Sequence, residues 1–516
     1  MTSRSALRSR RALAVPAGMA LATALAFLPA AATAAPLHPG GTTAAPAPRA
    51  EDGTALSYVV NVQRPDQVTI ARVKKEIVRA GGTVVQVYDR IGVVVAHAAD
   101  PGFAQRIRAV QGVQSAGATR TAPLPAQSTT AVGEPKRLTA AQARAAARQA
   151  APGQDPMQPL QWDLPAIKAD KAHEKTLGSR DVTVAVIDTG VDDTHPDIAP
   201  NFDRAASVNC VSGKPDTTDG AWRPGAQESP HGTHVAGEIA AAKNGVGVTG
   251  VAPGVKVSGI KVSTQAGFFY TEAVVCGFMW AAEHGVDVTN NSYYTDPWYF
   301  NCTTDPDQKA LVEAITRATR YAERKGAVNV AAAGNENFDL AADSLTDTSS
   351  PNDSTPGTRT VDPSVCLDIP TQLPGVVTVA STGAKGLKSS FSNYGLGVVD
   401  IAAPGGDNTR YQTPAPPAVS GLILGPLPGG GYGYMAGTSM ASPHVAGVAA
   451  LIRSTHPKAS AETVKSLLRE QADDTACPSP YDIDGDGTAD AVCEGGARHN
   501  GFYGAGIADA LDAVQK

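Results

Sequence analysis

VTVAVID, at residues 182–188, is the stretch that decides the fold: a mostly apolar run that ends in one aspartate. A short run of this kind is typical of a strand buried on both faces of a sheet. Five similar runs follow, at 254–262, 286–292, 327–335, 376–381 and 398–405. Stretches of helical character separate several of them, at 232–242, 271–284 and 306–325. Strands that alternate with helices predict an α/β fold, with a parallel sheet flanked by helices.

Polar residues stand where two of these strands end. Asp188 closes the first strand, and Asn335 closes the strand that ends in AAAGNE. In open α/β sheets, sites form at this carboxyl edge. Two further motifs lie at apolar helices: HGTHVAG places His231 just before one, and GTSMASPHVAG lets Ser439 open another.

Asp188, His231 and Ser439 are the residue types that a nucleophilic serine requires. A serine hydroxyl is a poor nucleophile at neutral pH, so it needs a base such as imidazole. The imidazole needs a carboxylate that fixes its tautomer and stabilises its cation. The developing oxyanion needs preorganised donors. The amide of Ser439, at a helix start, and the side chain of Asn335 are suited to that role.

Together these motifs resemble the subtilisin family of serine endopeptidases over residues 157–516, about two thirds of the chain. The resemblance implies a subtilisin-like fold without an organic cofactor. The implied roles are orienting carboxylate for Asp188, general base and acid for His231, nucleophile for Ser439 and oxyanion donor for Asn335. It makes His234 and His444 structural. A different serine hydrolase is disfavoured, because the nucleophile motif is GTSMAS and the triad order differs from that of the G-x-S-x-G enzymes.

The N-terminal third divides into four segments. Residues 1–35 combine four arginines, an Ala- and Leu-rich run and a small-residue end, which predicts a secretory signal peptide, with a membrane anchor as the alternative. Residues 36–56 form an Ala-, Pro- and Thr-rich spacer. Residues 57–117 predict a small α+β, ferredoxin-like unit of order βαββαβ, which resembles the inhibitory prosegment of the same family. Residues 118–156 are expected to be a linker and processing region.

Composition excludes several classes of protein. The 516 residues carry 43 basic and 49 acidic side chains, so no basic field indicates nucleic-acid binding. With 42% hydrophobic and 18% charged residues, the chain is globular rather than disordered. We expect a secreted, extracellular monomer without a stable membrane anchor, whose partners are protein or peptide substrates and its own prosegment.

The even cysteine count favours three disulfides in an exported protein. Six cysteines allow fifteen pairings, and the short separation of Cys477 and Cys493 makes these two the easiest pair to predict. A Cys302–Cys366 bridge would tie an altered wall of the specificity pocket to an inserted loop, and Cys210–Cys276 would then remain. These two pairings are hypotheses.

The resemblance also implies a calcium site made of side-chain and backbone oxygens, which suit Ca²⁺. Its ligands would be Gln158, Asp197, Asn244 and the carbonyls of Ala242, Val246 and Val248. A second candidate resembles the front of an EF-hand loop but has a cysteine at position 12. Its ligands would be Asp482, Asp484, Asp486 and Asp490. The alternatives are a packed metal-free loop and an acidic turn.

Substrate specificity is where the sequence departs from the family. The family continues its strand with Ser-Leu-Gly-Gly, whereas this chain has a tyrosine at the first glycine. The expected substrate-binding residues are Ser292, Tyr293, Tyr294, Ala333 and Gly334. The aromatic run 298–300 either packs under a loop or contacts substrate, and Asp296 is a weak candidate for binding a basic side chain.

The sequence therefore predicts a secreted serine endopeptidase made as a self-inhibited zymogen. Two alternatives stay open. One is a processing peptidase of narrow specificity, which the tyrosines and the insertions at 337–375 and 405–434 favour. The other is a catalytically silent binding protein of the same fold, which the intact set of catalytic residues disfavours.

Overall fold

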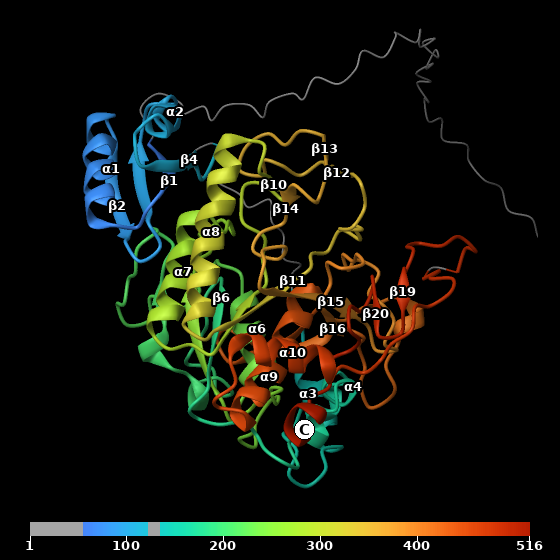
Figure 1. The fold of residues 1–516 in the computed structure, drawn as a ribbon. Coiled ribbons are helices and arrows are strands. Elements are labelled where there is room, and N and C mark those ends of the chain that lie inside the picture. The colour runs from blue at the N-terminus through green and yellow to red at the C-terminus, as the bar shows by residue number, and fades with distance from the viewer. Residues whose placement is uncertain (1–54, 122–134, 484) are drawn as a thin grey trace, which may run out of the picture. The chain divides into compact units, whose positions relative to one another are not determined.

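A seven-stranded sheet forms the centre of residues 157–516 (Figure 1). The computed structural model describes residues 55–121, 135–483 and 485–516. All neighbouring strands of this sheet are parallel, in the order β16-β15-β11-β9-β6-β8-β7. The strands are β6 (Thr183–Asp188), β7 (Val208–Asn209), β8 (Lys256–Lys261), β9 (Val288–Asn291), β11 (Val328–Ala332), β15 (Val376–Thr382) and β16 (Ile401–Pro404). The six predicted strands are therefore confirmed, and the short edge strand β7 is the addition.

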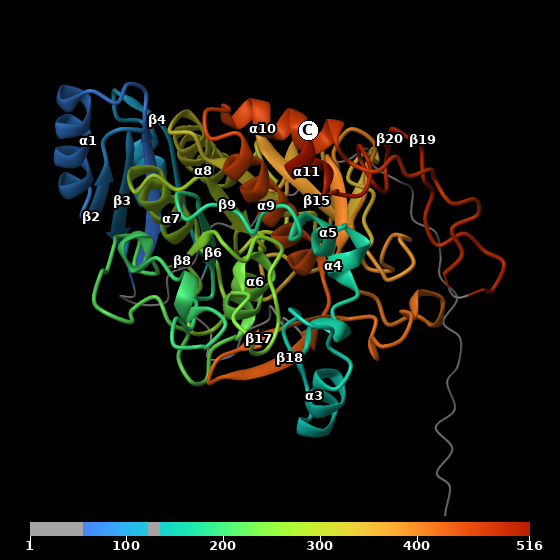
Figure 2. The same cartoon turned by 90° about the horizontal axis from the view of Figure 1, so that it is seen from below.

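Helices cover both faces of this sheet (Figure 2). One core holds side chains of α6 (His231–Ala240), α9 (Thr438–Thr455) and α10 (Ala461–Glu470). The other core holds side chains of α7 (Thr271–Glu283) and α8 (Pro306–Arg324). Strand β6 feeds the two cores alternately, because successive side chains of a strand point to opposite faces. This explains why its sequence is apolar throughout.

Local signals in the sequence begin and end these helices. Helix α8 begins after Asp305, whose carboxylate accepts hydrogen bonds from the amides of Asp307 and Gln308. Pro306 occupies its first turn, where a missing N–H costs nothing. The apolar face of α8 is buried against the sheet through alanines, Leu311 and Ile315.

The segment before the gap at residue 122 folds as a separate four-stranded antiparallel sheet with two helices. Its strand order is β2-β3-β1-β4, and its chain order is βαββαβ. Its elements are β1 (Leu56–Val62), α1 (Gln67–Arg79), β2 (Thr83–Tyr88), β3 (Val93–Ala98), α2 (Phe103–Arg108) and β4 (Val113–Ala118). The order of elements is the one expected for residues 57–117.

Two stretches that look irregular in the sequence contain regular structure. The Pro- and Gly-rich insertion ends in a hairpin of β17 (Ile423–Leu427) and β18 (Gly431–Met435), and β5 (Lys136–Arg137) pairs with β18. Helix α3 (Ala140–Ala147) follows β5 within the expected linker. The insertion at 337–375 holds β12 (Leu345–Asp347), β13 (Arg359–Val361) and β14 (Cys366–Leu367), and the last of these pairs with β10 (Asn301–Cys302). The remaining elements are α4 (Asp163–Ala166), α5 (Ala169–Ala172), β19 (Gly495–Gly496), β20 (His499–Asn500) and α11 (Asp512–Gln515).

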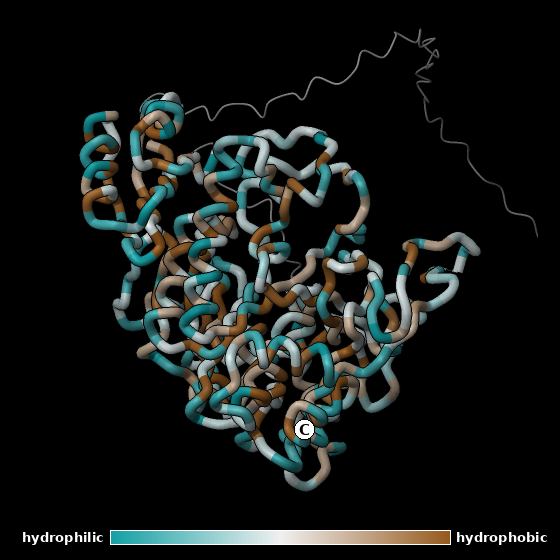
Figure 3. Tube along the Cα trace, viewed as in Figure 1, coloured by the Kyte–Doolittle hydropathy of each residue, from teal (hydrophilic) through white to brown (hydrophobic). Residues whose placement is uncertain are grey.

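Apolar segments concentrate along the central strands and their helices (Figure 3). All three proposed disulfide pairings are confirmed: Cys210–Cys276, which is fully buried and reaches α7, Cys302–Cys366 and Cys477–Cys493. No helix in the described ranges is long and apolar enough to span a membrane. The expected signal peptide and most of the expected spacer lie outside the described residues.

Candidate active site

Asp188 and His231 form a buried pair at the carboxyl edge of the sheet. Asp188 is the last residue of β6, and His231 is the first residue of α6. The His231 Nδ1–H donates to both carboxylate oxygens of Asp188, at 2.8 and 3.0 Å. Gly232 allows this approach, because a Cβ there would lie 2.5 Å from the carbonyl oxygen of Gly190. The pair fixes the imidazole tautomer and leaves Nε2 without a partner among the described residues.

Ser439 lies in the first turn of α9, where helical amides have no partner within the helix. Its hydroxyl donates to the carbonyl of Ser292 at 3.3 Å, and the hydroxyl of Ser292 donates back to the carbonyl of Ser439 at 2.9 Å. In substrate-free enzymes, catalytic hydrogen bonds are often long and tighten on binding. Ser439 is therefore held at the site by its two hydrogen bonds with Ser292.

Asn335 follows β11 and faces the same helix start. Its Oδ1 accepts hydrogen bonds from the amide of Thr438 at 2.8 Å and from the hydroxyl of Thr438 at 3.0 Å. Because the oxygen is used in this way, the side-chain amide is left as a donor beside Ser439. The Ser439 amide and the Asn335 Nδ2 thus form a pair of donors suited to an oxyanion.

A cavity of about 550 Å³ joins these residues. It is lined by the catalytic candidates His231, Asn335 and Ser439 together with Phe269, Ser292, Tyr293, Tyr294, Tyr299, Ala332, Gly334, Glu336, Ser349, Asp368, Phe391, Ala436, Gly437, Thr438 and Met440. The arrangement places a nucleophile, a base and oxyanion donors at one concave surface, as acyl transfer requires.

The family model described as "Subtilase family" matches residues 179–506, more than half of the chain. This chain belongs to the subtilase family. Over 315 residues it is 32% identical to the M-protease of Shouchella clausii and 31% identical to Subtilisin Savinase of Lederbergia lenta. Each match covers 61% of this chain, with 65% of the M-protease and 92% of Savinase. The match thus spans slightly less than two thirds of the M-protease.

Solved structures extend the likeness to the N-terminal unit. The epidermin leader peptide processing serine protease of Staphylococcus aureus has a TM-score of 0.62 with this subtilase at 23% identity. That match covers 89% of this chain and 98% of the other. At this identity the likeness concerns the fold.

Four of the five expected substrate-binding residues line the cavity of this subtilase: Ser292, Tyr293, Tyr294 and Gly334. Ala333 does not line it, because the side chain is fully buried behind the wall and Ala332 takes that place. Tyr293 stacks on Phe269 with ring centroids 4.6 Å apart and donates to Asn291. Its ring is thus part of a fixed wall.

The residues of the aromatic run 298–300 divide between the two roles expected for them, packing under a loop and lining the substrate site. Tyr299 lines the cavity, whereas Trp298 and Phe300 are buried behind it. Asp296 is fully buried and accepts hydrogen bonds from the Phe269 amide and the Asn352 side chain. Burial raises the pKa of Asp296 to about 7. Because Asp296 does not line the cavity, the structure gives it no contact with a substrate side chain.

Several further residues of the cavity wall were not anticipated from the sequence, among them Glu336, Asp368 and Phe391. Glu336 directly follows Asn335, so its position was readable from the AAAGNE motif. Asp368 lies just after β14, inside a polar insertion with no recognisable motif. No local pattern in the sequence distinguishes it from the other aspartates of that insertion.

His234 and His444 lie in a buried network below the catalytic residues. The Nε2–H of His234 donates to the Gly433 carbonyl at 3.1 Å, so its Nδ1 is the acceptor of the 2.6 Å bond to Glu238. Burial lowers the pKa of His234 to about 3 and raises that of Glu238 well above its ordinary value. Glu238 is therefore the donor, as a neutral acid. His444 contacts Asp163 at 3.1 Å and donates to a carbonyl of its own helix, which makes both histidines packing residues here.

The first calcium candidate has one feature that fits a cation. The Oδ1 of Asp197 is buried and has no hydrogen-bond partner in the described ranges. Its Oδ2 accepts from the Val248 amide at 3.0 Å, and burial raises the pKa of Asp197 to about 6. Asn244 donates to the Pro196 carbonyl, and the Asp197 carbonyl accepts from the Ala242 amide, so the Asp197 segment lies against the loop that follows α6.

Asp155 is a neighbour of this loop that the sequence did not reveal. It is 1% exposed and accepts from the Gly245 amide and the Thr249 hydroxyl, each at 2.7 Å. The Gln158 oxygen accepts from the Asp155 amide at 3.3 Å. Among the described residues, no group of three or more His, Cys, Asp or Glu side chains is placed to hold a metal ion. Besides the Asp197 carboxylate, a calcium ion here would rely on amide and backbone oxygens, Val246 included.

The second calcium candidate is described only in part, because Asp484 lies outside the described residues. The carboxylates of the other three accept hydrogen bonds from backbone amides of the same loop. These are Asp482, Asp486 and Asp490. Such bonds are equally typical of an acidic turn.

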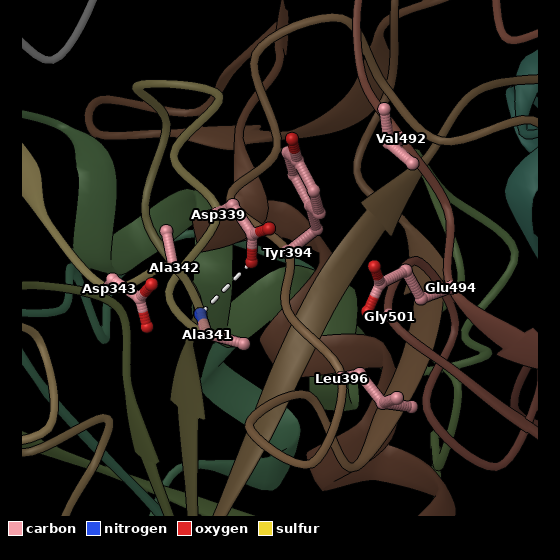
Figure 4. A pocket seen from close by; sticks show the side chains of 9 residues that line it. All are labelled: Asp339, Ala341, Ala342, Asp343, Tyr394, Leu396, Val492, Glu494 and Gly501. Carbon is pink, nitrogen blue, oxygen red and sulfur yellow. Dashed lines mark hydrogen bonds between the residues drawn. The ribbon is translucent and has the colours of Figure 1, made fainter.

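A second, smaller pocket lies apart from the catalytic residues (Figure 4). It measures about 210 Å³ and contains three carboxylates, from Asp339, Asp343 and Glu494. Asp339 accepts a hydrogen bond from the Ala341 amide at 3.0 Å, which Figure 4 shows as a dashed line. None of the catalytic candidates lines it.

Proposed function

We propose that this subtilase is a serine endopeptidase that hydrolyses peptide bonds through a seryl acyl-enzyme. The observation that carries the proposal is the cavity lined by His231, Ser439 and Asn335, with the buried Asp188 carboxylate bonded to His231 at 2.8 Å. The kinship with subtilisins supports it.

The geometry suits a two-step acyl transfer. The Ser439 hydroxyl leaves the Ser292 carbonyl and gives its proton to Nε2 of His231, while Oγ bonds to the scissile carbonyl carbon. The oxyanion accepts hydrogen bonds from the Ser439 amide and Asn335. His231 then returns the proton to the leaving amine, and the C–N bond breaks. Water repeats the sequence with His231 as base and releases the acid product and free Ser439.

We further propose that the chain is exported as a zymogen, with residues 57–117 as its inhibitor. Polar contacts support this role. Arg108 pairs with Asp307 at the start of α8, and the Ala118 amide donates to the same carboxylate at 3.2 Å. Gly117 allows the approach, because a Cβ there would lie 2.3 Å from the Asp307 carbonyl oxygen. The strands of the small sheet also share an apolar core with α7 and α8.

The end of this unit leads toward the cavity. Arg120 pairs with Glu272 at 2.6 Å and stacks over the ring of Tyr270. The Thr121 amide donates to Asp353 at 2.9 Å. The neighbouring Asn352 donates to the hydroxyl of Tyr294, a residue of the cavity wall. A tail held in this way would lie beside Tyr294 and would compete with substrate for this part of the cavity wall.

We propose calcium as a structural ligand of the Asp197 loop. The unpartnered Asp197 oxygen supports it, and the ion would stabilise the loop without taking part in the reaction.

Labelling with a fluorophosphonate tests the proposed activity, because only an activated serine reacts. Wild type should be labelled and should cleave a proteome-derived peptide library, whereas Ser439→Ala should do neither. A folded wild type that is neither labelled nor active would instead indicate the silent binding protein.

A further inference from the structure

The cavity beside Ser439 carries a carboxylate that the proposed reaction does not use. Asp368 lines the cavity and is 1% exposed. Its backbone is fixed by two bonds of 2.8 Å with Gln372, one to the side chain and one from the amide. Its Oδ1 is buried and has no hydrogen-bond partner in the described part of the chain. The backbone of Asp368 is thus fixed, while its Oδ1 is left without a hydrogen-bond partner.

The cavity wall supplies no cation to balance this carboxylate. No lysine or arginine is among the residues that line the cavity in the described ranges. A buried carboxylate without a partner is unfavourable, and burial, together with the Glu336 carboxylate, raises the pKa of Asp368 well above its ordinary value. A cation that enters the cavity from outside would give the carboxylate a partner and would favour its charged form.

The rest of the cavity suits a long cationic side chain. Tyr294, Phe391 and Ala332 offer apolar surface to a methylene stem, while the charged end reaches a carboxylate. Glu336 adds a second carboxylate to the wall, held by bonds from the Tyr299 hydroxyl and the Asn335 amide. The volume of about 550 Å³ leaves room for such a side chain beside the reacting groups.

We propose that Asp368 makes this subtilase selective for substrates with arginine or lysine on the acyl side of the scissile bond. The inference rests on the proposed function, because the cavity begins where Ser439 and Asn335 would hold the scissile carbonyl. The side chain next to that carbonyl is therefore the one that enters. Arginine should be preferred to lysine, since a guanidinium can donate two parallel hydrogen bonds to one carboxylate.

The test uses peptides that differ only in the residue before the scissile bond: Arg, Lys, Phe or Glu. The secreted, processed wild type should cleave the Arg peptide at a kcat/KM about 10²-fold or more above that of the Phe peptide. Asp368→Asn should remove most of this difference by slowing the Arg peptide alone. Asp339→Asn, in the separate acidic pocket, is the matched control and should keep the wild-type preference. The Phe peptide reports whether each variant is folded.

A binding measurement makes the inference independent of turnover. p-Aminobenzamidine, a fluorescent amidine cation, should bind saturably to wild type and to Ser439→Ala, and its binding should be lost in Asp368→Asn. Equal cleavage of Arg and Phe peptides, or equal loss of both in Asp368→Asn, would overturn the inference. A wild type that binds the amidine but is neither labelled by fluorophosphonate nor active would refute only the proposed function. If it fails to bind the amidine, the inference fails as well.

Discussion

The orientation of the Asn335 side chain is set by hydrogen bonds from Thr438. Its oxygen accepts the amide and the hydroxyl of Thr438, so the direction of the side-chain N–H is fixed before a substrate arrives. Gly334 is required just before it, with φ of +100°, because a Cβ there would lie 2.2 Å from the Tyr299 hydroxyl. Such fixed donors stabilise a transition state without the cost of reorganisation.

We therefore predict that Asn335→Ala lowers kcat and leaves KM nearly unchanged. The expected loss is about 10²–10³, the range known for such a donor in subtilisin itself. Steady-state kinetics on the best peptide give both constants, and fluorophosphonate labelling shows whether Ser439 stays reactive. A variant with unchanged kcat would remove Asn335 from the oxyanion site.

At the scale of single residues, a site residue could be predicted where a short local motif identified it. Asp188, His231 and Ser439 stand in short motifs that also specify their strand or helix, so each could be placed from the sequence. Asp368 could not, because its role depends on a loop returning to the cavity from a distant part of the chain. Ala333 does not line the cavity whereas Ala332 and Gly334 do, because successive residues of an extended segment point to opposite sides.

Helices α6 and α9 carry the candidate base His231 and the candidate nucleophile Ser439, and the Glu238 network joins the two helices. Glu238 donates to His234 within α6, and His444 of α9 contacts both Asp163 and Glu238. His234 also reaches Gly433 in β18. The network thus links α6 and α9 to the inserted hairpin β17–β18. The protonation state of Glu238 should therefore affect stability.

We predict that Glu238→Gln changes how stability depends on pH. The folded protein keeps the Glu238 proton above the ordinary pKa of 4.5, whereas the unfolded chain releases it. Relative to the variant, wild type should then lose about 1.4 kcal/mol of stability per pH unit from roughly pH 4.5 up to the folded pKa. The glutamine amide can still donate to His234 but does not ionise, so the variant lacks this slope. Urea unfolding of both proteins in a Ser439→Ala background measures the difference, and parallel curves between about pH 5 and 7 would contradict the prediction.

The strands and helices of the main sheet were predictable, whereas the hairpin β17–β18 was not. Buried strands are apolar throughout, but the hairpin is rich in Pro and Gly and pairs only with the two residues of β5. Helix α3 was hidden for a similar reason, since its Ala-rich sequence has no marked apolar face. Both are stabilised mainly by tertiary contacts, which a local pattern cannot show.

The loop around Asp197 gives a separate prediction for metal removal. If calcium binds the unpartnered oxygen, calcium should raise the melting temperature of the Ser439→Ala protein relative to a chelator. The gain is about 2.7 kcal/mol at a calcium concentration one hundred times the Kd. Asp197→Asn should abolish this shift, and Asp482→Asn, in the other candidate loop, should retain it. A shift that survives in Asp197→Asn would assign the ion elsewhere.

At the scale of the whole molecule, residues 136–156 associate with the peptidase part. Ala146 of α3 is fully buried in a cluster that includes Leu160, Ala241 and Val248. Asp155 is buried between the Gly245 amide and the Thr249 hydroxyl. Removing this segment would expose an apolar cluster and leave buried polar groups without partners.

The last prediction follows from this packing: the mature protein begins at or before Leu138, not near residue 157. Residues 121–135 contain no lysine or arginine, so a pocket selective for basic residues would cut after Arg120, Lys136 or Arg137. Intact mass and N-terminal sequencing of the secreted wild type measure the cut, and Ser439→Ala should keep residues 57–117 attached if the chain processes itself. A start near residue 157 would mean that α3 belongs to the removed part. Processing of Ser439→Ala at the same bond would assign the cut to another protease, whose specificity need not match the Asp368 pocket.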